Sequence, residues 1–247
     1  MFGMKIRELT SIVCFVSFFL FSCGPQEELS IKVVDENEKI DVQYEEGEIT
    51  DDPEYVEDNI VSVDILTEAI GDLTKDGIDE RVVIRNTSEV GDFGIIREIL
   101  IYNWEDEHWV LWHTSTGAVL PSEHGGMMGD PFEGVSIERG CIVFKHFGGS
   151  RDKWNYTHRF RFQNNNWELI GATIVVGAPC DQWETLDYNL SNGDVVYTIE
   201  YGECENELPT KDVNKFNQSV QSPFLMDGYP IGENFIVVMD DDGRMYF

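Results

Sequence analysis

One short segment of the chain has the residue types and the spacing of a cation-binding loop. Oxygen-bearing residues recur along Gly71–Glu80, and Gly77 lies where such a loop must turn sharply. Calcium is a hard cation that takes roughly six to eight oxygen ligands. We therefore predict a Ca²⁺ site with these ligands: Asp72, Thr74, Asp76 and Glu80 through their side chains, and Ile78 through its carbonyl. The alternative is an acidic turn whose aspartates accept hydrogen bonds from their own backbone amides.

Two glycine-rich segments, residues 124–130 and 148–153, combine a flexible backbone with polar and aromatic side chains. Loops at one end of a β-domain commonly carry its binding surface. The chain has six tryptophans, which is more than its core requires, so we expect one or two to be exposed. A tryptophan beside Asp and Arg suits a glycan or a protein ligand. The predicted ligand-binding residues are His124, Asp130, Ser150, Arg151 and Trp154.

No catalytic residue is assigned from the sequence. Ser150, Asp152 and two histidines, His146 and His158, have the residue types of a nucleophilic triad, but Gly148-Gly149-Ser150 lacks the G-x-S-x-G spacing of a nucleophile elbow. A pair of carboxylates that could hydrolyse a glycoside carries no information in a chain with 47 acidic residues. The sequence therefore favours binding over catalysis.

The first residues form a targeting signal. Met1–Arg7 is short and basic and Leu9–Phe21 is mostly apolar, which together indicate a secretory signal peptide. The signal ends in Leu20-Phe21-Ser22-Cys23-Gly24, which resembles a bacterial lipobox. The resemblance implies that the signal peptide is removed and that fatty acyl chains are attached to Cys23, which would anchor the chain in a membrane.

The composition divides the chain into three parts. Residues 1–22 are the expected signal peptide, residues 23–60 are rich in Asp and Glu and poor in aliphatic side chains, and residues 61–247 are expected to form a single β-rich domain. Self-repulsion should keep the acidic part extended as a disordered tether. An Asp directly after the lipidated cysteine would resemble an inner-membrane retention signal, but this chain has Gly24 there. We therefore expect an outer-membrane lipoprotein that faces the periplasm or the outside.

The charge of the chain excludes two classes of partner. The chain has 247 residues, with 17 Lys and Arg against 47 Asp and Glu, which gives a formal net charge of −30. Nucleic acids and anionic lipid surfaces bind proteins through patches rich in Lys and Arg. We therefore expect no nucleic-acid partner and attribute membrane attachment to the lipid anchor alone.

The body of the chain alternates with the period of β-strands. Side chains of Trp154–Phe162 alternate strictly, and Asn164-Asn165 offers a two-residue turn because Asn tolerates positive φ. This turn predicts the pairs Phe162–Trp167, Phe160–Leu169 and Arg161–Glu168. Aromatic residues then face each other and opposite charges meet, which fixes the register.

Other segments repeat this pattern of strands and turns. We predict an all-β, antiparallel fold, either a β-sandwich or a set of propeller-like blades. Two short segments, Ile60–Ile70 and Asp212–Ser219, are expected to form short helices. The expected strands and hairpins are Glu80–Arg85; Arg97–Trp104 with Trp109–Thr114; Gly134–Glu138 with Cys141–Phe147 around Arg139-Gly140; Glu184–Leu190 with Asp194–Tyr201 around Asn192-Gly193; and Phe235–Met239 with Met245–Phe247.

Three cysteines remain after removal of the signal peptide and lipidation of Cys23. A hairpin closed by Asn192-Gly193 would bring Cys180 within one residue of the register of Cys204. Because disulfides form in exported proteins, we predict a Cys180–Cys204 disulfide, with two separate thiols as the alternative. Cys141 begins an apolar strand and is expected to be a small buried residue.

The aspartate loop resembles the loops of integrin-α-type FG-GAP repeats, in which the loop precedes an apolar strand, as Arg81-Val82-Val83-Ile84 does here. Thr74 and Lys75 depart from the residues usual in those repeats. A wider resemblance rests on Gly126–Phe132, His146–Ser150 and the stretch from Phe160 to Gly171. These motifs are similar to those of bacterial exported lipoproteins that carry one such loop, and they imply a shared fold but no particular activity.

The function that these observations favour is an envelope-anchored binding module that takes an extracellular glycan or protein ligand. One alternative is an immunity or inhibitor protein, because a strongly acidic chain could neutralise a basic toxin enzyme. The other alternative is a polysaccharide hydrolase that uses a carboxylate pair.

Overall fold

The computed structural model describes residues 65–201, 210–239 and 243–247. These residues form thirteen strands, all paired antiparallel, and no helix of the described part is long and apolar enough to cross a membrane. The all-β, antiparallel class expected from the sequence is confirmed. The predicted signal peptide, Cys23 and the acidic tether lie outside the described residues.

The first sheet has four strands in chain order: β1 (Ile65–Gly71), β2 (Glu80–Gly91), β3 (Gly94–Glu105) and β4 (His108–Ser115). The predicted strand Glu80–Arg85 is the first half of β2. The predicted hairpin of β3 and β4 is confirmed, with Trp104 paired to Trp109. Asp106 and Glu107 close it with φ values of 47° and 68°.

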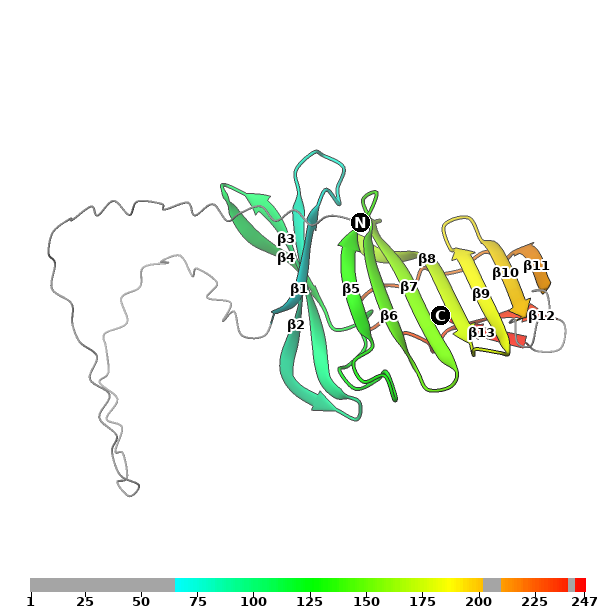
Figure 1. Ribbon diagram of the computed structural model, residues 1–247. Helices are drawn as coiled ribbons and strands as arrows, with labels where there is room; N and C mark the ends of the chain where they lie inside the picture. The colour runs from blue at the N-terminus through cyan, green and yellow to red at the C-terminus, as the bar shows by residue number, and fades with distance from the viewer. Residues whose placement is uncertain (1–64, 202–209, 240–242) are drawn as a thin grey trace, which may run out of the picture. The chain divides into compact units, whose positions relative to one another are not determined.

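The second sheet is a meander of seven strands. Figure 1 shows these strands side by side in chain order. A third sheet pairs β12 (Phe235–Met239) with β13 (Gly243–Tyr246), close to the predicted C-terminal hairpin. The seven strands of the second sheet are β5 (Phe132–Ile137), β6 (Ile142–Gly149), β7 (Lys153–Gln163), β8 (Asn166–Gly177), β9 (Gln182–Asn189), β10 (Asp194–Tyr201) and β11 (Thr210–Asn217).

The register predicted for β7 and β8 is confirmed. Phe162 pairs with Trp167, Phe160 with Leu169 and Arg161 with Glu168. Asn164 and Asn165 have φ values of 52° and 60°, which are the left-handed conformations that a type I′ turn requires. A bulge between Arg159 and Phe160 shifts the register by one residue in the rest of the ladder.

Two other turns differ in how well the sequence predicted them. The turn between β5 and β6 is confirmed at Arg139-Gly140, with φ values of 56° and 75°. The hairpin of β9 and β10 exists, but its loop is longer than the predicted Asn192-Gly193 because Asp194 pairs with Asn189. The Gly193 N–H donates to the Asn189 carbonyl over 2.8 Å and closes a four-residue loop instead.

Both expected short helices are wrong where the structure describes them. Ile65–Gly71 is the edge strand β1 and pairs with β2, and Thr210–Asn217 is the edge strand β11 and pairs with β10. Residues 60–64 lie outside the described part. Helical signals in both segments were weak, and pairing with an adjacent strand decides such cases.

A single cluster of buried residues includes side chains from all three sheets, such as Val82 of β2, Phe144 of β6 and Ile236 of β12. The loop before β5 adds Leu120, and the segment before β12 adds Met226. This cluster is the main core of the described part, and Val83, Leu100 and Tyr102 form a second, smaller cluster in the four-stranded sheet.

Candidate functional site

The two glycine-rich segments predicted to bind a ligand lie against each other. The Gly149 N–H donates to the Gly125 carbonyl over 3.0 Å, and Gly126 and Gly149 form an isolated bridge. Gly149 has a φ of 107°, and a Cβ at this position would lie 2.1 Å from the Asp152 carbonyl oxygen. Only glycine fits there, so the tight turn of the second loop from Gly149 to Asp152 depends on this residue.

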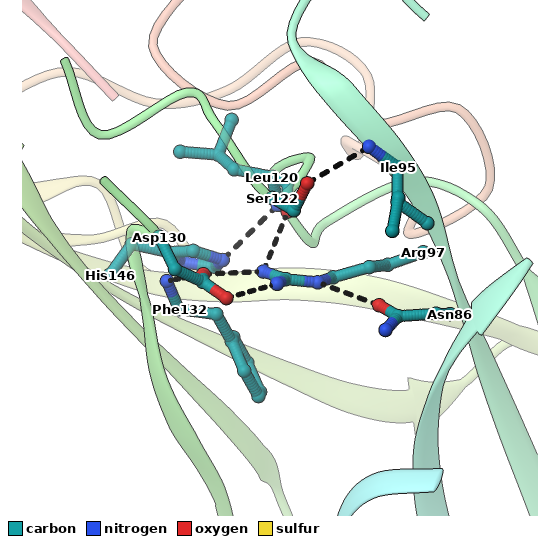
Figure 2. A network of polar contacts seen from close by, with 8 residues as sticks. All are labelled: Asn86, Ile95, Arg97, Leu120, Ser122, Asp130, Phe132 and His146. Carbon is teal, nitrogen blue, oxygen red and sulfur yellow. Dashed lines mark hydrogen bonds and ion pairs between the residues drawn. The ribbon is translucent and has the colours of Figure 1, made fainter. Parts of the chain in front are cut away.

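A buried arginine fixes the first of these loops (Figure 2). Arg97 of β3 is 1% exposed, and its two terminal nitrogens donate to the two carboxylate oxygens of Asp130. Its Nη1 also donates to the Leu120 carbonyl over 3.2 Å. The paired hydrogen bonds set both the position and the direction of the Asp130 side chain.

His146 binds the backbone of Leu120, the residue whose carbonyl accepts from Arg97. Its Nε2 accepts a hydrogen bond from the Leu120 N–H over 3.2 Å, as Figure 2 shows. Burial, with smaller contributions from nearby His158 and Arg97, lowers the pKa of His146 to about 3. The neutral ring can therefore act as an acceptor at physiological pH. Leu120 thus contacts Arg97 through its carbonyl and His146 through its amide.

A cavity of about 390 Å³ opens beside the second glycine-rich loop. Trp154 and Tyr156, two residues apart on β7, point to the same face of the sheet and stack with ring centroids 4.9 Å apart and an interplanar angle of 23°. Together they form an aromatic wall. The cavity is lined by Asp152, Lys153, Trp154, Tyr156, Val176, Gly177, Ala178, Asp181, Gln182 and Glu184.

The position of Trp154 depends on the glycine that faces it. Trp154 pairs with Gly148 of β6, and a Cβ on Gly148 would lie 2.2 Å from the indole ring. The indole therefore lies directly against the backbone of Gly148. Any larger residue at position 148 would displace the ring from the cavity wall.

Glu184 is the polar group held most firmly in this cavity. Its Oε2 accepts a hydrogen bond from the Tyr197 hydroxyl over 2.7 Å, and its Oε1 accepts one from Gln182 Nε2 over 2.7 Å. Burial, together with the hydrogen bond to the Glu184 carboxylate, raises the pKa of Tyr197. The hydroxyl therefore stays protonated and donates, so that the carboxylate keeps one orientation.

Arg151 joins two turns at the rim of the cavity. Its terminal nitrogens lie 3.4 Å from Asp152 and 3.1 Å from Asp181. All three side chains are exposed, so these ion pairs contribute little stability. Cys180, beside Asp181, is disulfide-bonded, whereas Cys141 is a free, buried thiol as expected. Cys204 lies outside the described residues, so its pairing with Cys180 stays a prediction.

The structure divides the predicted ligand-binding residues into two groups. Trp154 lines the cavity, and Arg151 and Ser150 lie in the turn at its rim, where the Ser150 N–H donates to the Asp152 carbonyl over 3.0 Å. His124 instead stacks on Phe93 with ring centroids 4.3 Å apart, and Asp130 pairs with Arg97. These last two residues position the loop and do not line the cavity.

Sequence reasoning missed the carboxylate and the amide of the cavity. Glu184 and Gln182 belong to β9, which is two strands away from Trp154 in the sheet. Alternation along β7 was enough to place Tyr156 beside Trp154. No comparable signal pointed to β9, because its placement depends on the register of the intervening strand β8.

The carboxylates of the predicted calcium loop accept hydrogen bonds from the loop itself. Asp72 accepts from the N–H groups of Lys75 and Gly77, and Asp76 accepts from the N–H of Ile78. Among the described residues, no group of three or more His, Cys, Asp or Glu side chains is arranged to hold a metal ion. These contacts are those of an acidic turn, and calcium binding stays a prediction.

Glu80, at the end of this loop, binds the backbone at the beginning of the loop. Its Oε2 accepts from the Leu73 N–H over 2.6 Å and from the Thr74 N–H over 3.2 Å, and the Thr74 hydroxyl lies 3.4 Å from its Oε1. Burial raises the pKa of Glu80, although the two backbone hydrogen bonds act in the opposite direction. The side chain therefore anchors the loop to the start of β2.

Comparisons with family models, with curated proteins and with solved structures found no match to this chain. The case for a function therefore depends on the geometry of the Trp154 cavity.

Proposed function

We propose that the chain is an envelope-anchored binding module that holds a glycan in the Trp154 cavity. The observation that carries the proposal is the stacked pair of Trp154 and Tyr156, with the fixed carboxylate of Glu184 in the same cavity. The apolar face of a sugar ring packs on an aromatic side chain. Its hydroxyl groups both donate and accept, so they suit the carboxylates and the Gln182 amide that line the cavity.

The charges of the cavity favour an uncharged ligand over an acidic one. Asp152, Asp181 and Glu184 line it with Lys153, and Arg151 at its rim pairs with the two aspartates, so the carboxylates outnumber the cations by three to two. An anionic sugar would be repelled by these carboxylates and by the net charge of −30. The volume of about 390 Å³ falls in the range of roughly 300–1,000 Å³ that is typical of small-ligand sites. We therefore favour a neutral glycan.

The N-terminal part of the chain supports an extracytoplasmic location for this binding. A lipid on Cys23 would attach the chain to the outer membrane, and the acidic residues 23–60 would separate the β-domain from the bilayer. A domain tethered in this way meets glycans of the envelope or the medium. The lipobox and the composition of the tether are the support for this part of the proposal.

Calorimetric titration of the full-length protein with neutral hexasaccharides of glucose, mannose and N-acetylglucosamine tests the proposal, with a hexagalacturonate as the acidic control. We expect saturable binding of at least one neutral chain, weakened roughly tenfold or more by Trp154→Ala. Trp104→Ala is the matched control, because Trp104 is 42% exposed and lies on the four-stranded sheet.

Two outcomes would contradict the proposal. One is the absence of binding to every neutral chain by folded protein, and the other is binding that Trp154→Ala leaves unchanged. Chromatography of the titrated sugars adds a check on chemistry. Release of shorter products would favour the polysaccharide hydrolase and would identify Glu184 and Asp181 as the first carboxylates to replace.

A further inference from the structure

A second cavity, of about 720 Å³, lies farther along the same sheet. It is formed by β10, β11 and β12, and several of its apolar or aromatic side chains are exposed, among them Tyr201 at 42%. Asp212 and Asn214 add polar groups. The remaining lining residues are Tyr197, Ile199, Val213, Phe216, Val237, Val238 and Met239.

The pairing of β9 with β10 makes the two cavities neighbours. Gln182 and Glu184 line the first cavity, and in the ladder they face Tyr201 and Ile199, which line the second. The hydrogen bond from the Tyr197 hydroxyl to Glu184 crosses between the two. The cavities therefore share a wall made of two adjacent strands.

The same row of paired residues continues across five strands. Trp154 pairs with Val176, Val176 with Glu184, Glu184 with Ile199, and Ile199 with Asp212. Because neighbouring strands are about 4.8 Å apart, this row extends roughly 19 Å from β7 to β11. Every member of the row lines one of the two cavities.

We propose that the two cavities are successive subsites of one elongated site, which binds a neutral oligosaccharide chain across β7–β11. This inference rests on the proposed function of the Trp154 cavity and extends it to the length of the ligand. The Trp154–Tyr156 pair holds one sugar unit, and Tyr201 offers a second aromatic surface. Glu184 on β9, between them, and Asp212 on β11, beyond Tyr201, present carboxylate oxygens to hydroxyl groups.

The chemistry of the second cavity fits such a chain. An oligosaccharide presents apolar ring faces and hydroxyl edges in turn, and the lining has both apolar side chains and the polar Asp212 and Asn214. The carboxylate of Asp212 continues the preference of the first cavity for ligands without negative charge. An extended apolar peptide is the competing occupant, and the experiment below separates the two.

A series of chain lengths tests the inference. The full-length protein is titrated with the di-, tetra- and hexasaccharide of whichever neutral sugar it binds, and with a Val-Thr hexapeptide. We expect affinity to rise roughly tenfold or more from disaccharide to hexasaccharide. Tyr201→Ala should abolish this rise and leave disaccharide binding unchanged. Tyr246→Ala is the matched control, because Tyr246 is 43% exposed on β13 and lines neither cavity.

The outcomes separate this inference from the proposed function. Affinity that depends on Trp154 but not on chain length would overturn the elongated site and leave the first cavity as the binding site. Binding of the hexapeptide, lost in Tyr201→Ala, without any dependence on sugar length would assign the second cavity to a peptide and overturn the inference. No sugar binding at all would overturn both.

Discussion

Arg97 and Asp130 form a two-pronged ion pair between different parts of the fold: Arg97 belongs to the four-stranded sheet, and Asp130 lies in the loop before the seven-stranded sheet. Burial alone would raise the pKa of Asp130. The hydrogen bonds from Arg97 and from the Phe132 N–H, together with the charge of Arg97, more than offset this effect and lower the pKa. The pair therefore connects β3 to the loop that contacts Gly149.

Replacing Asp130 by Asn should destabilise the domain by about 1–3 kcal/mol, because the buried guanidinium of Arg97 then lacks its anionic partner. The carboxylate is half exposed, so solvent screening keeps the cost below that of a fully buried pair. Urea unfolding measures the change. Asp152→Asn, at an exposed ion pair, is the control and should cost less than about 0.5 kcal/mol. Equal effects of the two substitutions would contradict a structural role for the Arg97–Asp130 pair.

Peptide mapping under non-reducing conditions should recover Cys180 linked to Cys204. A disulfide that closes the loop from Cys180 to Cys204 should stabilise the fold by about 3 kcal/mol. Reduction should therefore lower the melting temperature by several degrees. Cys141→Ala should leave this response to reduction intact, because Cys141 is a free thiol. A Cys180 peptide linked to any other cysteine would refute the predicted pairing.

Acid should destabilise the domain through its two buried histidines. The pKa of His158 is lowered to about 3, chiefly by burial and to a lesser extent by the charge of Arg159, and that of His146 is also about 3. As pH falls below about 6.5, the unfolded chain takes up protons that the folded chain does not. Each histidine should therefore lower the free energy of unfolding by about 1.4 kcal/mol per pH unit until the pH reaches its folded pKa.

His158→Leu is the variant that isolates this effect. Neither ring nitrogen of His158 has a hydrogen-bond partner among the described residues, and its ring packs near Tyr156 and Tyr229. The variant should therefore keep its stability at neutral pH and lose about half of the histidine-dependent slope between roughly pH 6 and pH 4. Urea unfolding at a series of pH values measures both quantities. Identical slopes in the variant and the parent would contradict the assignment.

The aspartate loop gives a test of calcium binding that does not involve the cavity. If the loop binds Ca²⁺, an excess of the ion should raise the melting temperature of the parent, and Asp76→Ala should abolish the increase. Glu80→Gln should destabilise the fold by about 1–2 kcal/mol with or without the ion, because Glu80 accepts hydrogen bonds from Leu73 and Thr74. An unchanged melting temperature of the parent would leave the loop as a turn held by its own hydrogen bonds.

The sequence was most informative where a strand pattern and a turn agreed. Strict alternation along Trp154–Phe162 and the Asn164-Asn165 turn together specified one register, and that register is present. The edge strands β1 and β11 were mistaken for helices. Each pairs on one side only. Seven of the eight residues of β11 are exposed, so little apolar periodicity marks it as a strand.

The candidate site was predictable only in part for a related reason. The aromatic wall lies on one strand, so alternation within Trp154–Phe162 was sufficient to find it. Glu184 and Tyr197 reach each other from adjacent strands, and Arg97 and Asp130 meet across 33 residues of chain. Contacts between separate elements of this kind depend on the packing of the whole domain.

The most direct test of the Trp154 cavity is a heteronuclear NMR titration of the indole N–H signals of the six tryptophans. The Trp154 signal is assigned from the Trp154→Phe variant, and a neutral hexasaccharide that binds in calorimetry is added. We predict that the Trp154 signal shifts and saturates with the calorimetric Kd, while the signals of Trp104 and Trp109 on the four-stranded sheet stay in place. Saturable binding that leaves the Trp154 signal unmoved would contradict the account.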